Sequence, residues 1–218
     1  MTPDLDPDRR LALAYAPSAA RAPLEALWRL DVTLGAVLAR GREPMVAQIR
    51  LAWWREALER LDGAPPPPEP ILQALAAQVL PAGVSGADLA AMEEGWAVLL
   101  AEEPLDSRAL QIYAEARGGL LFHHSARLLG AAESVETAGA RWALVDLARR
   151  STRPQEIMAA LDAAAAIAPE PTWPKRLRPL ALLSMLARRD IERRVAPFES
   201  QGSPGRMIRL LKYRLTGR

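Results

Sequence analysis

The sequence predicts an all-α protein, in which one helical domain extends over residues 1–218. Three observations support this fold class. Alternation of apolar and polar residues with period two, the pattern of β-strands, is absent, whereas Ala, Leu, Arg and Glu dominate and favour helices. Prolines and glycines cluster between longer stretches, as expected for helices joined by turns. Half of the residues are apolar and a quarter are charged, which is typical of a globular protein.

The expected helices follow from these breaks in chain order. The segment "DGAPPPPEP" (62–70) ends the third helix, because consecutive prolines cannot continue a helix. The segment "PAGVSGAD" (81–88) is a turn in which Ser85 caps the following helix. Two further breaks lie at 168–174 and 196–206, and none of the four is long enough to link separate domains. Helices are therefore expected over 8–16, 21–40, 44–62, 69–80, 86–101, 104–130, 134–150, 154–168, 174–196 and 204–215.

Composition excludes several classes of function. The chain has no cysteine, which excludes disulfides, thiolate catalysis and cysteine-ligated metals. No apolar run approaches the roughly 18 residues that a membrane-spanning helix needs. The first ten residues are acidic and lack the apolar segment of a secretory signal. We therefore expect a cytoplasmic protein, with peripheral association at the inner membrane as the alternative.

The charge is unevenly distributed along the chain. The net charge is +2, yet residues 175–218 hold twelve Lys and Arg against three acidic residues. Such a basic end favours an anionic partner, such as a membrane surface or a diphosphate, unless it pairs with the acidic remainder of the chain. The last expected helix places leucines on one side and Arg209, Lys212 and Arg214 elsewhere, so these three are candidates for membrane contact. No nucleic-acid partner is expected, because the basic residues are not interleaved with aromatics.

The helix expected over 44–62 contains the pair Trp53 and Trp54. Apolar residues form two stripes along this helix, so both tryptophans are predicted to lie in the core or in the wall of an apolar pocket. Arg50 and Arg55 lie near the pair and could receive an anionic head group. The other interpretation is a local ion pair, since Arg55 and Glu59 stand four residues apart.

Several stretches resemble the squalene/phytoene synthase family. The most specific is "EPMVAQIRLAWWREAL" (43–58), which is similar to the branch that includes complex I assembly-factor homologues. "AYAPSAARAPLEALWRLDVTLG" (14–35) resembles the first long helix, which begins near an arginine, here Arg21. "YAEARGGLLFHHSARLLG" (113–130), with Tyr113 and Arg117, resembles the tyrosine-containing helix. "AGARWALVDLARR" (138–150) and "LRPLALLSMLARRDIERR" (177–194) resemble later helices, as does the closing "RLTGR".

The resemblance implies a prenyl-synthase helical bundle and a particular chemistry. Catalytic members condense two prenyl diphosphates head to head, with Mg²⁺ neutralising the leaving diphosphate. The metal is held by two D-x-x-x-D motifs on facing helices, because this spacing puts both carboxylates of a motif on one helix face. The cavity between the helices has to exclude water so that the carbocation survives.

This sequence departs from the family pattern at the decisive positions. The first motif would fall near Gly35 and Ala39, where no carboxylate stands, and Asp31 lies one turn earlier. In the second, Asp146 is followed four residues later by Arg150. The adjacent Arg29 and Arg149 are expected to pair with the two aspartates, so neither a catalytic residue nor a metal ligand is assigned.

The resulting hypothesis is a non-catalytic family member that acts by binding. Its ligand would be an isoprenoid or prenyl diphosphate, or it would serve as an assembly or scaffold factor for a membrane respiratory complex. No cofactor is expected. Two alternatives remain open: an active prenyltransferase with a Mg²⁺ site at Asp31 and Asp146, and a ligand-free helical adaptor with a basic, membrane-docking C-terminus. The ligand-binding candidates are Arg21, Asp31, Arg50, Trp53, Trp54, Arg55, Tyr113, Arg117 and Asp146.

Overall fold

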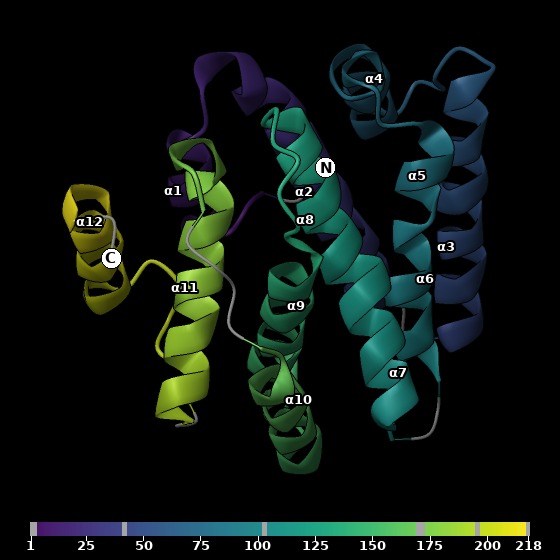
Figure 1. Ribbon diagram of the computed structural model, residues 1–218. Coiled ribbons are helices and arrows are strands. Elements are labelled where there is room, and N and C mark those ends of the chain that lie inside the picture. The colour runs from purple at the N-terminus through teal and green to yellow at the C-terminus, as the bar shows by residue number, and fades with distance from the viewer. Residues whose placement is uncertain (1–3, 41–42, 102–103, 169–172, 195–196, 217–218) are drawn as a thin grey trace.

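The computed structural model describes residues 4–40, 43–101, 104–168, 173–194 and 197–216, except for the side chains of residues 40 and 213–216. Helices form all the regular structure within these ranges, which contain no β-strand (Figure 1). The all-α prediction is therefore confirmed. The first half contains α1 (Pro7–Ala14), α2 (Ser18–Arg40), α3 (Pro44–Glu59), α4 (Pro70–Gln78), α5 (Gly86–Ala90) and α6 (Met92–Ala97). The second half contains α7 (Ser107–Ile112), η4 (Tyr113–Gly119), α8 (Leu120–Leu128), α9 (Glu136–Arg150), α10 (Pro154–Ala166), α11 (Arg178–Arg193) and α12 (Pro204–Thr216). Short 3₁₀ turns lie at Arg60–Asp62, Leu80–Ala82, Val98–Leu100 and Lys175–Leu177.

Local sequence signals set the helix boundaries. The Asp6 side chain accepts a hydrogen bond from the backbone N–H of Arg9 at 2.9 Å and caps α1. Ser85 forms a reciprocal capping box with Asp88 at the start of α5, which confirms the predicted cap. Proline stands in the first turn of α1, α3, α4, α10 and α11, where its missing N–H costs no helical hydrogen bond.

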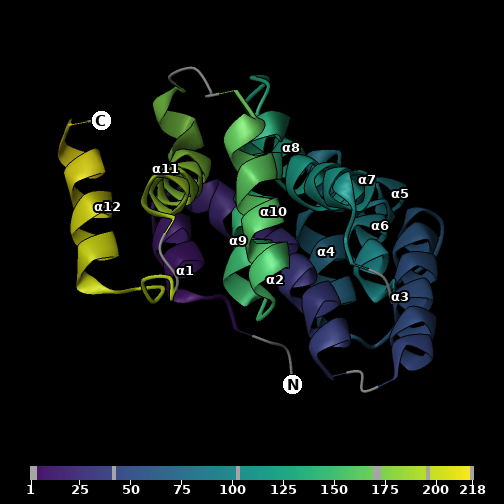
Figure 2. The ribbon, with the colours of Figure 1, turned by 90° about the horizontal axis from the view of Figure 1, so that it is seen from below.

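Two long helices organise the packing. α2 contacts α1, α3, α4, α6 and α8, while α9 contacts η4, α8, α10 and α11. Figures 1 and 2 show α3 at one edge of the molecule and α12 at the opposite edge, where it packs on α11. Buried apolar residues from Leu5 to Leu210 belong to one hydrophobic cluster. Across the described ranges, every helix is too short or too polar to cross a bilayer.

The helix predicted over 104–130 is interrupted by a π-helical segment, η4. Glycines let this segment approach its neighbours closely. A Cβ atom on Gly118 would meet the carbonyl oxygen of Gly139 in α9, and one on Gly95 in α6 would lie 2.6 Å from the backbone nitrogen of Arg117. Close approach on both sides buries Arg117 between α6 and α9, a placement that helical periodicity alone does not predict.

The two adjacent tryptophans of α3 have different environments. Trp54 is buried, whereas Trp53 is 44% exposed and meets Trp54 edge to face at 5.2 Å. The prediction that both line the core is wrong for Trp53, because α3 is an edge helix that packs through one face. Met45 and Ile49 are also exposed and stand at four-residue intervals before Trp53, so α3 presents an apolar stripe to solvent.

Candidate functional site

The carboxylates of Asp31 and Asp146 meet across the guanidinium group of Arg117. Asp31 comes from α2, Arg117 from η4 and Asp146 from α9. Arg117 Nε donates to Asp31 Oδ1 at 2.9 Å, and its Nη2 donates to Asp31 Oδ2 at 3.1 Å and to Asp146 Oδ2 at 2.6 Å. All three side chains are buried, and those of Asp31 and Arg117 are completely inaccessible. One cation therefore joins two carboxylates that lie 115 residues apart in sequence.

Two further groups complete the environment of Asp31. Arg9 Nη2 of α1 donates to Asp31 Oδ2 at 2.7 Å. The indole Nε1 of Trp96 in α6 donates to Asp31 Oδ1 at 3.1 Å. Both oxygens of Asp31 are thus occupied by donors from three other segments of the chain. A buried carboxylate with this many charge-assisted bonds is stable as an anion.

Asp146 and Arg117 have partners of their own. Arg150, one turn after Asp146 in α9, donates from Nε to Asp146 Oδ2 at 2.8 Å and keeps 52% of its side chain exposed. Arg117 Nη1 donates to the hydroxyl of Tyr113, which is fully buried. The chain Arg9–Asp31–Arg117–Asp146–Arg150, called here the central network, runs from the core to the surface.

Aromatic rings enclose the guanidinium group of Arg117. Its carbon Cζ lies 4.1 Å from the ring centroid of Trp96, 5.0 Å from that of Trp142 and 5.3 Å from that of Tyr113. Rings at these distances attract a cation through their electron-rich faces. They also exclude water, so the charged groups depend on one another for stabilisation.

The electrostatics keep both aspartates ionised. Burial by itself raises the pKa of the Asp31 carboxyl, but the guanidinium groups of Arg117 and Arg9 outweigh it and hold that pKa below its usual value. For Asp146, burial is likewise opposed by Arg117 and Arg150, and the pKa is lowered. Burial raises the pKa of the Tyr113 hydroxyl, so it stays protonated at neutral pH. The carboxylates are therefore anions already matched by cations of the protein itself.

The expected pairing of each aspartate with its adjacent arginine is wrong in detail. Arg29 donates to Glu25 on its own helix, and Arg149 pairs with Asp190 of α11 at 3.0 Å. Residues two or three positions from an aspartate point to other helix faces or pack on other elements, so more distant arginines take these roles. The arginines that contact the two aspartates are instead Arg9, Arg117 and Arg150.

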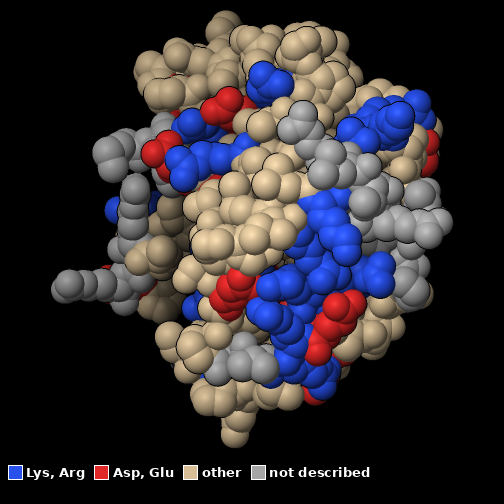
Figure 3. All heavy atoms as spheres, turned by 90° about the vertical axis from the view of Figure 1, so that its left-hand side faces the viewer, with Lys and Arg blue, Asp and Glu red and all other residues tan. Residues whose placement is uncertain are grey.

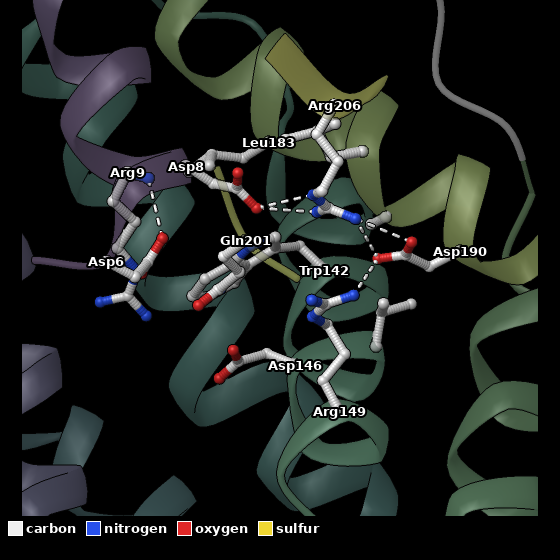
Figure 4. Close-up of a pocket in the computed structure, with 13 residues that line it drawn as sticks. Asp6, Asp8, Arg9, Trp142, Asp146, Arg149, Leu183, Asp190, Gln201 and Arg206 are labelled. Atoms are coloured by element: carbon white, nitrogen blue, oxygen red, sulfur yellow. Dashed lines mark hydrogen bonds and ion pairs between the residues drawn. The ribbon is translucent and has the colours of Figure 1, made fainter. Parts of the chain in front are cut away.

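A second ion-pair network lies beside the first and joins the two ends of the chain. Arg206 of α12 pairs with Asp8 of α1 at 2.8 Å and with Asp190 of α11 at 2.8 Å, and Arg149 also reaches Asp190 (Figure 4). The hollow between this network and Asp146 has a volume of about 20 Å³. That space has room for one water molecule and is too small for a prenyl chain.

The residues present do not fit the magnesium site of the family. Mg²⁺ takes about six oxygen ligands in near-octahedral geometry. Here the oxygens of Asp31 accept from Arg117, Arg9 and Trp96, and Oδ2 of Asp146 accepts from two guanidinium groups. Among the described residues, no group of three or more Asp, Glu, His or Cys side chains is arranged to hold a metal ion. The guanidinium group of Arg117 thus occupies the space between the two carboxylates.

The other ligand-binding candidates lie away from this centre. Arg21 is exposed and donates to the carbonyl oxygens of Ala14 and Ala16. Arg50 is exposed on α3, and Arg55 pairs with Glu59 at 3.3 Å, as the local interpretation predicted. The structure thus brings together Asp31, Tyr113, Arg117 and Asp146, and it leaves Arg21, Arg50, Trp53, Trp54 and Arg55 outside. The candidate side chain of Arg214 lies outside the described residues.

Sequence reasoning missed several members of the site, namely Arg9, Trp96, Trp142 and Arg150. One signal was available for Trp96. Gly35, one turn after Asp31, leaves a space on the face of α2, and a Cβ atom there would lie 2.6 Å from the Trp96 ring. The indole therefore covers a position at which the family motif would place a carboxylate.

An apolar groove lies behind this centre, between α7, η4, α9 and α10. Its volume is about 490 Å³, and alanines and leucines form most of its lining. This volume falls within the range of about 300–1,000 Å³ that is typical of ligand pockets. It is larger than the hollow beside Asp146, of about 20 Å³, and than the hollow lined by Arg150 and Arg153, of about 280 Å³.

The helical architecture and the facing aspartates define an all-α protein of the isoprenoid-synthase type. The sequence profile of the squalene/phytoene synthase family matches residues 3–168, more than half of the chain. The chain belongs to the squalene/phytoene synthase family. No curated protein and no solved structure matches it. The narrower resemblance of residues 43–58 to the assembly-factor branch stays a prediction.

Proposed function

We propose that this family member does not condense prenyl diphosphates and acts instead by binding an isoprenoid ligand. One observation supports the loss of catalysis most directly: the Arg117 guanidinium occupies the space between Asp31 and Asp146. A metal ion at that position would have to displace a buried cation that also contacts Tyr113 and Trp96. Displacement of a buried, paired charge is strongly unfavourable.

Retention of a binding role is supported by the family and by the groove. The family acts on prenyl diphosphates, so an isoprenoid is the ligand class to which the ancestral fold was adapted. The groove between α9 and α10 offers an apolar space of suitable size outside the central network. Binding there would need no metal, because the groove is separate from the aspartates.

The direct test is incubation of the pure protein with farnesyl diphosphate or geranylgeranyl diphosphate and Mg²⁺. Extracts are examined by mass spectrometry, and a catalytic squalene synthase treated in parallel shows that the assay works. We expect no condensed product from this protein, neither a condensed diphosphate nor a hydrocarbon, because its aspartates are bound by arginines. Thermal stabilisation by the prenyl compound should be the same with Mg²⁺ and with EDTA. A condensed product would contradict the proposal.

A second candidate function, docking on an anionic membrane, is supported by α12. Ile208 and Leu211 of this helix are 65% and 47% exposed, and Arg209 and Lys212 beside them are also exposed. Figure 3 shows Lys and Arg gathered on the face of the molecule that bears α11 and α12. Exposed apolar residues flanked by basic ones are typical of helices that lie on anionic lipid. Leu210 of the same helix is buried, so α12 also closes the bundle.

Charge reversal tests this docking. The double change Arg209→Glu and Lys212→Glu should weaken co-sedimentation with phosphatidylserine vesicles more than about tenfold, since each basic residue near the surface contributes about 1 kcal/mol. The matched control, Arg55→Glu with Arg60→Glu on the opposite edge, should bind like the wild type. Equal binding by wild type and the α12 variant would exclude this patch.

A more specific version of the binding role is that the protein serves as a scaffold in the assembly of a membrane complex. It is supported by the apolar stripe of Met45, Ile49 and Trp53 on α3, which is 44–72% exposed. Met and aromatic residues are enriched where proteins contact partners. The same stripe lies within the segment that resembles the assembly-factor branch.

A further inference from the structure

Two hollows lie behind the central network, and they are called here the apolar section and the basic section. The apolar section, of about 490 Å³, is lined mainly by Leu110, Ala114, Ala140, Leu144, Ala159 and Ala163. The basic section, of about 280 Å³, lies at the turn between α9 and α10 and is lined by Leu147, Arg150, Ser151, Arg153 and Glu156. Leu105 borders both sections, so they adjoin.

Helical spacing indicates that the two sections form one channel. The α9 side is formed by residues 140, 144 and 147 and ends at 151, with spacings of four, three and four residues. The α10 side is formed by residues 156, 159, 163 and 167, with spacings of three, four and four. Such spacings place each set on one face of its helix. Because α9 and α10 are packed against each other and joined by a short turn, both faces border the same channel.

The basic section has a small excess of positive charge. Arg150 uses its Nε atom on Asp146 and keeps half of its side chain exposed. Arg153 is 71% exposed, and among the described residues it pairs with the Glu156 carboxylate at 4.0 Å. Glu156 in turn accepts a hydrogen bond from the hydroxyl of Ser151. Among the described residues that line this section, two guanidinium groups stand against one carboxylate, and this balance favours an anionic head group.

We propose that this channel binds a single-chain isoprenoid with one anionic head group. The tail lies along the alanine-lined section between α9 and α10, and the head is held by Arg150 and Arg153 without a metal ion. A guanidinium fork donates two parallel hydrogen bonds to phosphate or carboxylate oxygens, so either head group has the required chemistry. This inference rests on the proposed function and adds the place, orientation and charge of the ligand.

The tail section is tested by filling it. Ala163→Trp puts an indole into the groove, and Ala165→Trp puts the same group on the exposed face of the same helix. Binding of farnesyl monophosphate, farnesoic acid and farnesol is measured by isothermal titration calorimetry in EDTA. We expect Ala163→Trp to abolish binding of all three compounds and Ala165→Trp to bind as the wild type does. Circular dichroism and melting temperatures verify that both variants fold.

The head section is tested by removing one charge. Arg153→Gln should weaken binding of the anionic compounds about tenfold, the value of one charge-assisted hydrogen bond, and leave farnesol unchanged. Arg60→Gln is the matched control, because Arg60 is similarly exposed and pairs with a glutamate four residues earlier, Glu56. Whichever of farnesyl monophosphate and farnesoic acid binds more tightly identifies the preferred head group as phosphate or carboxylate.

The possible outcomes test the location of the site in the channel separately from the proposed isoprenoid-binding function. If wild type binds and Ala163→Trp binds equally well, the channel is not the site, while the proposed binding function stands. If Arg153→Gln weakens farnesol as much as the anions, the orientation is wrong. If wild type binds none of the three compounds, the isoprenoid-binding role is wrong as well. Formation of a condensed product from prenyl diphosphates would overturn the proposed loss of catalysis, whatever the binding data.

Discussion

Arg117→Met is expected to lower the free energy of unfolding by about 3–5 kcal/mol, the usual effect of removing one partner from a buried ion pair. The methionine fills much of the same volume, so the loss is mainly electrostatic. Asp31 would keep Arg9 and Trp96 but lose two hydrogen bonds, and Asp146 would keep only Arg150 among the donors described above. Urea unfolding followed by circular dichroism measures the difference.

Two further variants identify the cause of this loss. Arg55→Met removes an exposed arginine of α3 and should change stability by less than about 0.5 kcal/mol. Arg117→Lys restores a cation between the two carboxylates without the guanidinium fork, and it should recover part of the lost stability. If Arg117→Met costs no more than Arg55→Met, the central network does not stabilise the fold, and the argument against a metal at this site loses its basis.

Gly118→Ala is expected to destabilise the protein by about 3 kcal/mol, near the upper end of overpacking effects. The added Cβ atom would meet the backbone carbonyl of Gly139 and lie 2.6 Å from Cβ of Ala143. A backbone carbonyl cannot rotate away as a side chain can, so η4 has to move off α9. The same movement would pull Arg117 from Asp146, which pairs with it across this crossing.

The adjacent glycine provides the control for this prediction. At Gly119 the nearest heavy atom to an added Cβ would lie 3.7 Å away, an ordinary contact. Gly119→Ala should therefore be neutral or stabilise by up to about 1 kcal/mol, because alanine loses less conformational entropy in a helix than glycine. Both variants are compared by thermal and urea unfolding. Equal effects of the two substitutions would show that the crossing of η4 and α9 tolerates a methyl group.

Much of the fold could be predicted from the sequence because helix boundaries depend on local chemistry. The proline run at 62–70 ends a helix wherever it stands, and Ser85 caps the helix that follows it. The missing carboxylate at Gly35 and the arginine at position 150 are likewise visible in the sequence, and they predicted an altered aspartate site. The basic character of the last helices is also a property of composition.

The sequence by itself therefore determined the all-α class, most helix boundaries and the loss of the metal-binding pattern. The tertiary structure decided which cation lies between the two aspartates. That cation is Arg117, which lies 86 residues from Asp31, and Arg9 and Trp96 reach the same carboxylate from two other helices. It also decided that Trp53 faces solvent while Trp54 faces the core. Helical periodicity tells which residues share a face, but the partner of a buried charge is chosen by the packing of whole helices against one another.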